Sequence, residues 1–297
     1  ILVLMPGIGR EVNGAQRWLP LLGALTVQPS EFAKFALLLY TAGYLVRQED
    51  AVRHHWQGLA KLIFILGIVA FLLLLEPDFG ATVIAVGAVV GMMFLAGARL
   101  IYVLALLASV ALGFLVLVFS APYRLQRLTA YQDPWSDPFG AGFQLVQSLI
   151  AFGRGEWFGV GLGNSIQKLF YLPEAHTDFV FSIWAEETGL FGALLLILLF
   201  VGLITRIMQT GWRAAAEGNG FAAYLCFGAG LMFAGQVFIN MGASSGLLPT
   251  KGLTLPFVSY GGSSLIMNCA LLGIVLRIAQ QLRPEQCTDQ TVSRRVL

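Results

Sequence analysis

Charged residues are scarce in this sequence. Asp, Glu, Lys and Arg make up only 11% of its 297 residues, while 57% are apolar, and a soluble domain carries roughly 25% charged residues. So little polar surface cannot cover an apolar core of this size, which excludes a water-soluble protein. The mean hydropathy of +0.77 points the same way. The composition therefore predicts a polytopic membrane protein.

Cysteines and basic clusters are scarce as well. The three cysteines, Cys226, Cys269 and Cys287, form an odd set with two members in apolar runs, so neither a disulfide framework nor a metal cluster is indicated. Lys and Arg form no runs or blocks, and nucleic-acid binding therefore has no support. The chain starts with five apolar residues, Ile1–Met5, which are too few to span a bilayer. We expect this stub to be the end of a helix whose beginning is missing.

Seven segments are long and apolar enough to cross a membrane as helices of about 20 residues. They are Pro29–Val46, Leu59–Leu75, Phe79–Ala98, Leu100–Ser120, Phe179–Thr205, Phe221–Ser244 and Ser263–Leu282. Their length excludes the alternating ten-residue strands of an outer-membrane barrel. We predict an all-α polytopic membrane protein that forms a single domain over residues 1–297, with a long loop at residues 121–178.

Seven spans divide the loops into two sets that face opposite sides. The first set is residues 6–28, 76–78, 121–178 and 245–262. The second set is residues 47–58, the turn at Arg99, residues 206–220 and the tail after Leu282. Counting Lys61, Arg206 and Arg277 at helix ends, the second set holds ten of the eighteen Lys and Arg residues. The positive-inside rule therefore places the second set in the cytoplasm and the long loop outside.

The long outward loop contains one predicted helix. Apolar residues recur at helical spacing over residues 143–150, with polar residues on the other side. Such a pattern is typical of a short amphipathic helix that lies in the membrane interface. Ordinary packing against the spans explains the pattern equally well, and both alternatives stay open.

Asp178 ends the long loop and opens the following span. Asp178 or Thr177 is well placed to cap that helix by accepting backbone N–H bonds, and capping alone would explain an acid here. In the functional alternative, a carboxylate at the outer mouth of the bundle removes a proton from a substrate hydroxyl, with Glu174 and His176 close in sequence. Glu186 and Glu187, about 12 Å farther along the helix, either line the same cavity or form structural ion pairs.

Polar residues also open the first complete span. Glu31 stands where a capping-box acid would, after a proline at the first helical position. Lys34 follows three residues later, a spacing that allows the two side chains to pair on one helix face. Gln28 precedes this helix, and Arg17-Trp18 adds a cation and an aromatic residue typical of membrane interfaces.

Residues 248–262 form the last notable segment. They contain two prolines and three glycines, and Lys251 is their sole charge. Irregular backbone at membrane depth has to be buried or line a cavity, which predicts a re-entrant outer loop. A single lysine in such a loop suits a phosphate group. The outward cations around one carboxylate together favour an anionic, lipid-linked substrate.

Five segments resemble the SEDS family, the FtsW and RodA polymerases of bacterial cell-wall synthesis. They are Val12–Trp18 (VNGAQRW), Gln28–Lys34 (QPSEFAK), Glu76–Thr82 (EPDFGAT), Pro173–Phe179 (PEAHTDF) and Leu248–Ser264 (LPTKGLTLPFVSYGGSS). Residues 172–178 and 250–256 resemble the division branch, FtsW, more than the elongation branch, RodA. The resemblance implies a fold of ten transmembrane helices, of which this chain covers about seven complete spans and a stub of the third helix.

The resemblance also implies an activity. It is polymerisation of lipid II into glycan strands at the outer face of the bacterial cytoplasmic (inner) membrane, at the division septum. Asp178 matches the family's proposed catalytic aspartate, and Lys34 and Lys251 match positions implicated in activity. We expect the remaining substrate-binding residues to be Gln28, Glu31, Arg17, Trp18, Glu174, His176 and Ser259. The implied protein partners are an FtsI-type class B penicillin-binding protein and FtsQ, FtsL and FtsB.

The implied chemistry needs one base and no paired acid, because a lipid pyrophosphate leaves without a proton. A single displacement inverts the anomeric centre, unlike the two-carboxylate mechanism of retaining glycosidases. The sequence identifies no cofactor with certainty, and lysines, arginines or a divalent cation such as Mg²⁺ or Mn²⁺ would stabilise the developing pyrophosphate charge. Two alternatives remain at this point: a lipid II flippase, and a scaffold that recruits division proteins without chemistry.

Overall fold

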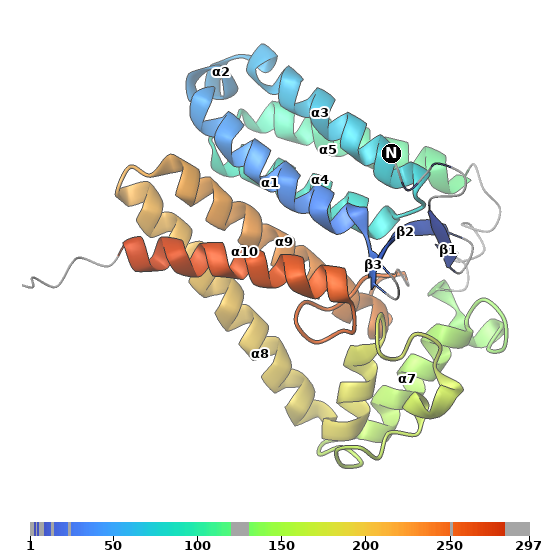
Figure 1. Ribbon diagram of the computed structural model, residues 1–297. Coiled ribbons are helices and arrows are strands. Elements are labelled where there is room, and N and C mark those ends of the chain that lie inside the picture. The colour runs from blue at the N-terminus through green and yellow to red at the C-terminus, as the bar shows by residue number, and fades with distance from the viewer. Residues whose placement is uncertain are drawn as a thin grey trace, which may run out of the picture.

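A bundle of long helices makes up most of the computed structural model, which describes residues 3, 5, 9–12, 15–22, 25–119, 131–249 and 252–282 (Figure 1). The bundle helices are α1 (Pro29–Arg47), α3 (Trp56–Leu75), α4 (Phe79–Leu95), α5 (Leu100–Phe119), α8 (Val180–Ala216), α9 (Gly220–Ser244) and α10 (Gly262–Gln281). Each of the seven predicted spans corresponds to one of these helices. By length and composition, α3, α8, α9 and α10 are apolar enough to cross a membrane, and α4 and α5 are shorter apolar helices. The predicted membrane helix bundle is confirmed.

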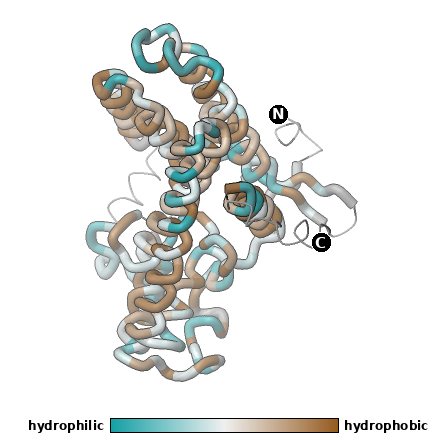
Figure 2. Tube along the Cα trace, turned by 90° about the vertical axis from the view of Figure 1, so that its left-hand side faces the viewer, coloured by the Kyte–Doolittle hydropathy of each residue, from teal (hydrophilic) through white to brown (hydrophobic). Residues whose placement is uncertain are grey.

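Helix α9 is the centre of the bundle. It contacts α1, α4, α8 and α10 and is buried along most of its length. Its many Gly and Ala residues let neighbouring helices approach closely, as small residues do in membrane bundles. Large apolar side chains on α3, α5 and α8 remain exposed, as expected for surfaces that face lipid. Figure 2 shows hydrophobic residues along the helices and hydrophilic residues concentrated near their ends.

Three short strands precede the bundle, which the prediction of an all-α chain missed. They are β1 (Arg10–Val12), β2 (Ala15–Leu22) and β3 (Leu25–Val27), in an antiparallel sheet of order β1-β2-β3. The register pairs Val12 with Ala15, and the sequence between them is Asn-Gly. This dipeptide is the strongest short-range signal for a two-residue hairpin, and the sheet corrects the expectation that residues 6–28 form a loop. Strands β1 and β3 have three residues each, and the eight residues of β2 do not alternate between apolar and polar.

Helix α7 (Phe143–Gly155) confirms the helix predicted in the long loop. It packs against α8 and buries Leu145, Val146 and Ala151. The buried hydroxyl of Ser148 donates a hydrogen bond of 2.6 Å to the carbonyl oxygen of Ser244 at the end of α9. Packing against the spans, one of the two alternatives left open by the sequence, is therefore what this helix does.

Helix α8 is broken at Gly189, whereas the sequence predicted one continuous span. Gly189 has φ 67° and ψ −166°, a backbone conformation that residues other than glycine rarely adopt. The segment 156–161 takes up the backbone groups that the break leaves unpaired. Val160 and Gly161 donate to the carbonyls of Glu186 and Glu187, at 3.0 and 3.1 Å. The part of α8 before the break is thus a separate short helix that lies beside α7 (Figure 1).

The two predicted loop sets lie at opposite ends of the bundle. At one end, α2 (Glu49–His54) approaches the turn before α5, where Arg53 donates to the carbonyl of Ala96 at 3.3 Å. At the other end, the starts of α1, α4 and α10 meet the sheet and the residues before α8 (Figure 1). This second end is the predicted outward side, and it gathers the candidate site.

Candidate active site

The first part of the site is a hydrogen-bonded cluster around Asp78. One carboxylate oxygen of Asp78 caps α4 by accepting from the Ala81 N–H at 3.1 Å. The other oxygen accepts from the Ser30 hydroxyl at 3.0 Å and from the Gln28 amide at 3.2 Å. The Gln28 backbone N–H donates to the Ser263 hydroxyl on α10, at 3.0 Å. Gln28, predicted from the sequence as a site residue, thus joins the outer ends of α1, α4 and α10.

One turn deeper on α1, Lys34 and Glu31 form the ion pair that their spacing predicted. The Lys34 Nζ lies 2.8 Å from Glu31 Oε1, and the side chains are only 1% and 8% exposed. An ammonium group has three donors, and this contact uses one of them. Among the described residues, nothing hydrogen-bonds to the other two donors, and a buried cation in this state near the outer end of α1 is suited to receive an anionic group.

Arg17 reaches the same cluster from β2. Its Nε donates to the carbonyl of Glu76 at 3.1 Å, and its Nη2 donates to the carbonyl of Pro77 at 2.7 Å. These bonds fix the guanidinium group beside the turn that carries Asp78. Trp18 follows on the strand and pairs with Arg10 in the sheet register. Among the described residues, no hydrogen bond joins the Trp18 side chain to this cluster.

Asp178 is the second part of the site, and its carboxylate does not cap α8. The helix begins at Val180 with Phe179 at the N-cap position, and no side chain caps it. Within the described parts of the chain, no donor hydrogen-bonds to the Asp178 carboxylate. A Cβ atom on Gly252 would lie 3.1 Å from Asp178 Oδ2, so the carboxylate faces the re-entrant segment across a glycine. Capping therefore does not explain this acid.

The environment of Asp178 favours its neutral form. Burial is the largest cause that raises the pKa of this carboxyl group from 3.8 to about 7, and the negative charge of Glu174 is the second. Arg17 lowers the pKa and Asp78 raises it by smaller amounts. A carboxylate with a pKa near the working pH has both a useful ionised fraction and enough basicity to accept a proton.

The segment before α8 is tied to the re-entrant segment by hydrogen bonds. The Ser259 hydroxyl donates to the carbonyl of Thr177 and accepts from the Leu255 N–H at 2.7 Å. The Tyr260 N–H donates to the carbonyl of His176 at 2.9 Å, and the two rings lie 5.9 Å apart. Ser259 and His176, both predicted as site residues, thus lie at the site and hold its two segments together.

Glu174 and Lys251 are two further residues predicted from the sequence. Glu174 accepts a hydrogen bond of 2.7 Å from the Thr177 hydroxyl, which keeps its carboxylate on the loop that carries Asp178. Lys251 lies outside the described residues. The segment that follows it begins at Gly252, against Asp178.

With this geometry in view, comparison with known proteins identifies the family. The family described as cell cycle protein, which comprises FtsW, RodA and SpoVE proteins, matches residues 1–284. The chain belongs to the FtsW/RodA/SpoVE family. It is 56% identical to a protein of Hahella chejuensis over 98% of this chain and 73% of that protein, and 54% identical to one of Pseudomonas fluorescens over 95% and 69%. Both relatives are named "Probable peptidoglycan glycosyltransferase FtsW".

Solved structures of FtsW/RodA/SpoVE-type proteins share the fold. A chain from a structure titled "Structural coordination of polymerization and crosslinking by a peptidoglycan synthase complex" superposes with a TM-score of 0.75, at 35% identity over 96% of this chain and 79% of that chain. The rod shape determining protein RodA of Thermus thermophilus superposes with a TM-score of 0.64, at 30% identity over 96% and 75%. The multi-pass membrane fold of the family is thus present here.

Two acids of this FtsW/RodA/SpoVE-family chain have a structural role. Glu186 is fully buried and accepts hydrogen bonds from the Ser165 hydroxyl and the Ile166 N–H, with Arg154 3.5 Å away. Glu187 lies 2.7 Å from the Lys168 ammonium group. Of the two alternatives drawn from the sequence, structural ion pairs are correct. These acids hold the outer loop on α8.

The acids of the site do not form a metal-binding group. Across the residues that the structure describes, no three His, Cys, Asp or Glu side chains gather closely enough to hold a metal ion. Mg²⁺ prefers near-octahedral oxygen ligation, with one or two carboxylates plus substrate phosphates and water. The described residues therefore provide no preformed cage for the divalent cation considered above.

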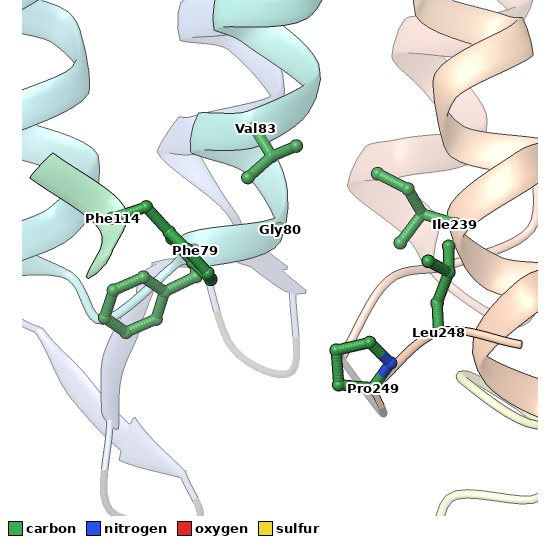
Figure 3. A pocket seen from close by; sticks show the side chains of 7 residues that line it. All are labelled: Phe79, Gly80, Val83, Phe114, Ile239, Leu248 and Pro249. Atoms are coloured by element: carbon green, nitrogen blue, oxygen red, sulfur yellow. The ribbon is translucent and has the colours of Figure 1, made fainter. Parts of the chain in front are cut away.

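An apolar cavity of about 130 Å³ borders the polar cluster. Its lining residues come from α4, α5, α9 and the residues after α9, namely Phe79, Gly80, Val83, Phe114, Ile239, Leu248 and Pro249 (Figure 3). Phe79 directly follows Asp78, and Gly80 packs against Leu253 of the re-entrant segment. The polar site and an apolar cavity therefore meet at the start of α4.

Sequence reasoning missed several residues of the site. Asp78 and Ser30 were within recognised motifs but were not chosen, although an acid directly before an apolar run is a helix-cap signal. Asn240 of α9, whose amide donates to the carbonyls of Asp178 and Leu253, was missed altogether. An amide within an otherwise apolar run is the signal that could have revealed it, because polar residues inside membrane helices usually face the bundle interior.

Proposed function

We propose that this chain is a peptidoglycan glycosyltransferase that polymerises lipid II at the outer face of the bacterial cytoplasmic membrane, with Asp178 as the general base. Its FtsW relatives carry the name of this activity. The observation that carries the assignment of the base is the Asp178 carboxylate, which is largely desolvated, caps no helix and faces Gly252. A carboxylate in that state has no structural partner among the described residues and is available to take a proton.

The reaction is a single displacement at an anomeric carbon. A sugar hydroxyl of one lipid II molecule, or of a growing strand, attacks the anomeric carbon of another. The new C–O bond forms as the bond to the lipid pyrophosphate breaks, and the pyrophosphate leaves with the electron pair. Asp178 accepts the hydroxyl proton in the same step. One displacement inverts the anomeric centre, so an α-linked donor becomes a β-linked chain.

Side-chain cations supply the charge that the leaving group needs. We propose that Lys34, Arg17 and Lys251 lie around the pyrophosphate: Lys34 and Arg17 because they lie at the outer end of the bundle, and Lys251 because its segment matches the family motif. Fixed positive charges aimed at a developing negative charge stabilise the transition state more than the ground state. Gln28, Glu31, Glu174, His176, Ser259 and Trp18 complete the proposed substrate-binding set.

The apolar cavity supports a lipid-linked substrate. Phe79 and Phe114 line it on one side and Ile239 on the other (Figure 3). An isoprenoid chain that enters between these residues would bring its pyrophosphate toward Asp78 and Arg17, where the polar cluster begins. A soluble sugar nucleotide has no apolar chain that could occupy this cavity.

We also propose that the chain acts at the division septum with an FtsI-type class B penicillin-binding protein and with FtsQ, FtsL and FtsB. The support is its similarity to proteins named FtsW and to a chain from a peptidoglycan synthase complex in which polymerisation and crosslinking are coordinated. Co-purification of the full chain with each candidate partner from detergent-solubilised membranes tests this part.

Polymerisation of labelled lipid II tests the activity and its base together. The full chain is assayed with its transpeptidase partner, whose crosslinking activity is blocked, and wild type is compared with Asp178→Asn. Asp133→Asn is the matched control, because Asp133 is an exposed acid of the same loop. Strands from wild type and the control but none from Asp178→Asn are expected. Strands from all three proteins would show that Asp178 is not the base, and lipid II movement across vesicles without strands would establish a flippase.

A further inference from the structure

Asn240 occupies an unusual position on α9. Its side chain is 1% exposed, and its Nδ2 donates hydrogen bonds to two carbonyl oxygens, that of Asp178 at 2.9 Å and that of Leu253 at 2.5 Å. Both partners are pure acceptors, so the amide orientation is determined by its neighbours. One side chain of a membrane helix thus holds both outer segments of the site.

The two carbonyls belong to segments that do not adjoin in sequence. One segment carries the base Asp178, and the other begins at Gly252, whose backbone lies against the Asp178 carboxylate. Ser259 and Tyr260 tie the two segments to each other. Asn240 does something different, because it ties both of them to α9.

Helix α9 is a suitable fixed point for this purpose. It is packed on several sides by α1, α4, α8 and α10, and closely packed helices resist displacement. In its last turn, the Ser244 hydroxyl donates to the carbonyl of Asn240 at 2.8 Å and lies 3.5 Å from the same Asp178 carbonyl. Ser244 in turn accepts a hydrogen bond from Ser148 of α7. The hydrogen bond from Asn240 therefore holds the backbone of Asp178 against α9, which is buried along most of its length.

Stability alone does not account for an amide at this point. The Asn240 Oδ1 is buried and finds no hydrogen-bond partner among the described residues, and a buried acceptor without a partner destabilises a fold. The feature that the position uses is the NH₂ group, which can donate to two acceptors at once. That points to a requirement for the spacing of the two segments.

We propose that Asn240 is a positioning residue for glycosyl transfer, which sets the distance between the Asp178 base and the segment that starts at Gly252. The inference rests on the proposed function, because it assumes that Asp178 accepts the proton. Asn240 itself touches no substrate in this proposal. It acts through the two backbone carbonyls, so its loss should affect the chemical step and leave substrate binding almost unchanged.

Steady-state polymerisation of labelled lipid II by the full chain with its blocked transpeptidase partner tests this. For Asn240→Ala we expect kcat to fall about 10- to 100-fold, the range that a misplacement near 1 Å produces, with KM within about 2-fold and the pH midpoint of kcat unchanged. Gln236→Ala is the matched control, since Gln236 is an equally buried amide one turn away on α9. Its kcat should stay within about 2-fold of wild type.

Asn240→Asp provides a signature that a merely structural role would not give. It keeps the shape, places oxygen opposite two carbonyl oxygens, and adds an acid near Asp178. Its kcat should fall further than that of the Ala variant, and the pH midpoint should move upward because a second negative charge disfavours ionisation of Asp178. Wild-type kcat in Asn240→Ala, or an equal loss in Gln236→Ala, overturns the proposal.

Two further readouts separate the ways of failing. Thermal unfolding and size-exclusion profiles show whether each variant folds, and Asn240→Ser, which keeps one donor on a smaller side chain, decides the matter if the Ala variant does not fold. An intermediate kcat supports the proposal, and a wild-type kcat in Asn240→Ser overturns it. If Asp178→Asn retains activity, the proposed base is wrong, and this is visible independently of any result at Asn240.

Discussion

Replacing Asp178 by Asn should make the protein more stable at alkaline pH while it abolishes polymerisation. The carboxyl group has a pKa near 7 in the folded protein, against 3.8 as its ordinary value. A change of that size corresponds to about 4 kcal/mol between the two protonation states. Because the charged form is disfavoured by burial, this free energy destabilises the fold whenever Asp178 is ionised.

The sign follows from proton binding. Below about pH 4 the carboxyl group is protonated in both the folded and the unfolded chain, and it costs nothing. Between pH 4 and 7 only the folded protein holds the proton, so stability falls as pH rises. Above about pH 8 both states are ionised, and the full destabilisation of up to about 4 kcal/mol is present. An amide at this position has no such dependence.

Thermal unfolding in detergent measures the effect. A difference of this size corresponds to an increase in Tm of roughly 5 to 10 °C for Asp178→Asn at pH 8.5, and the increase should shrink markedly at pH 5. Asp133→Asn, at an exposed position of the same loop, should show no such change. The reasoning is refuted if the Tm difference between wild type and Asp178→Asn is the same at both pH values. The polymerisation rate of wild type should rise with pH through a midpoint near 7.

Three further predictions concern neighbours of the base. The pH–rate profile of Glu174→Gln should have its midpoint at a lower pH than that of wild type, because the negative charge of Glu174 raises the pKa of Asp178. An unchanged midpoint would contradict this. Gly252→Ala should reduce kcat about 10-fold or more, since the new methyl group would lie 3.1 Å from the carboxylate; a kinetic assay of the folded variant decides. Lys34→Met should destabilise the protein by about 3–5 kcal/mol through the unpaired Glu31, and adding Glu31→Gln should restore Tm but not activity.

Much of the bundle could be predicted because a bilayer imposes a length on apolar helices. Runs such as Leu59–Leu75 and Phe221–Ser244 have no other stable arrangement in lipid. The break at Gly189 could not be foreseen, because glycines occur within many continuous membrane helices. The segment 156–161, which is distant in sequence, supplies hydrogen bonds that stabilise a break there.

The site could be predicted to a similar extent and for related reasons. Once the spans are counted, Gln28 and Asp178 must lie at the same end of the bundle, and the structure places them there. Sequence could not reveal whether Asp178 caps its helix, since that depends on the local backbone. It also could not reveal Asn240, because its two acceptors come from segments that only the fold brings together.

The central place of α9 has a consequence for how the protein is made. Helices α1 and α4 both pack on α9, yet α9 begins at Gly220, long after α4 ends at Leu95. At about 5–20 residues per second of synthesis, the ribosome needs on the order of ten seconds to make the intervening chain. For that time the nascent α1 and α4 lie in the membrane with the faces that pack on α9 still open, and the arrival of α9 closes those faces.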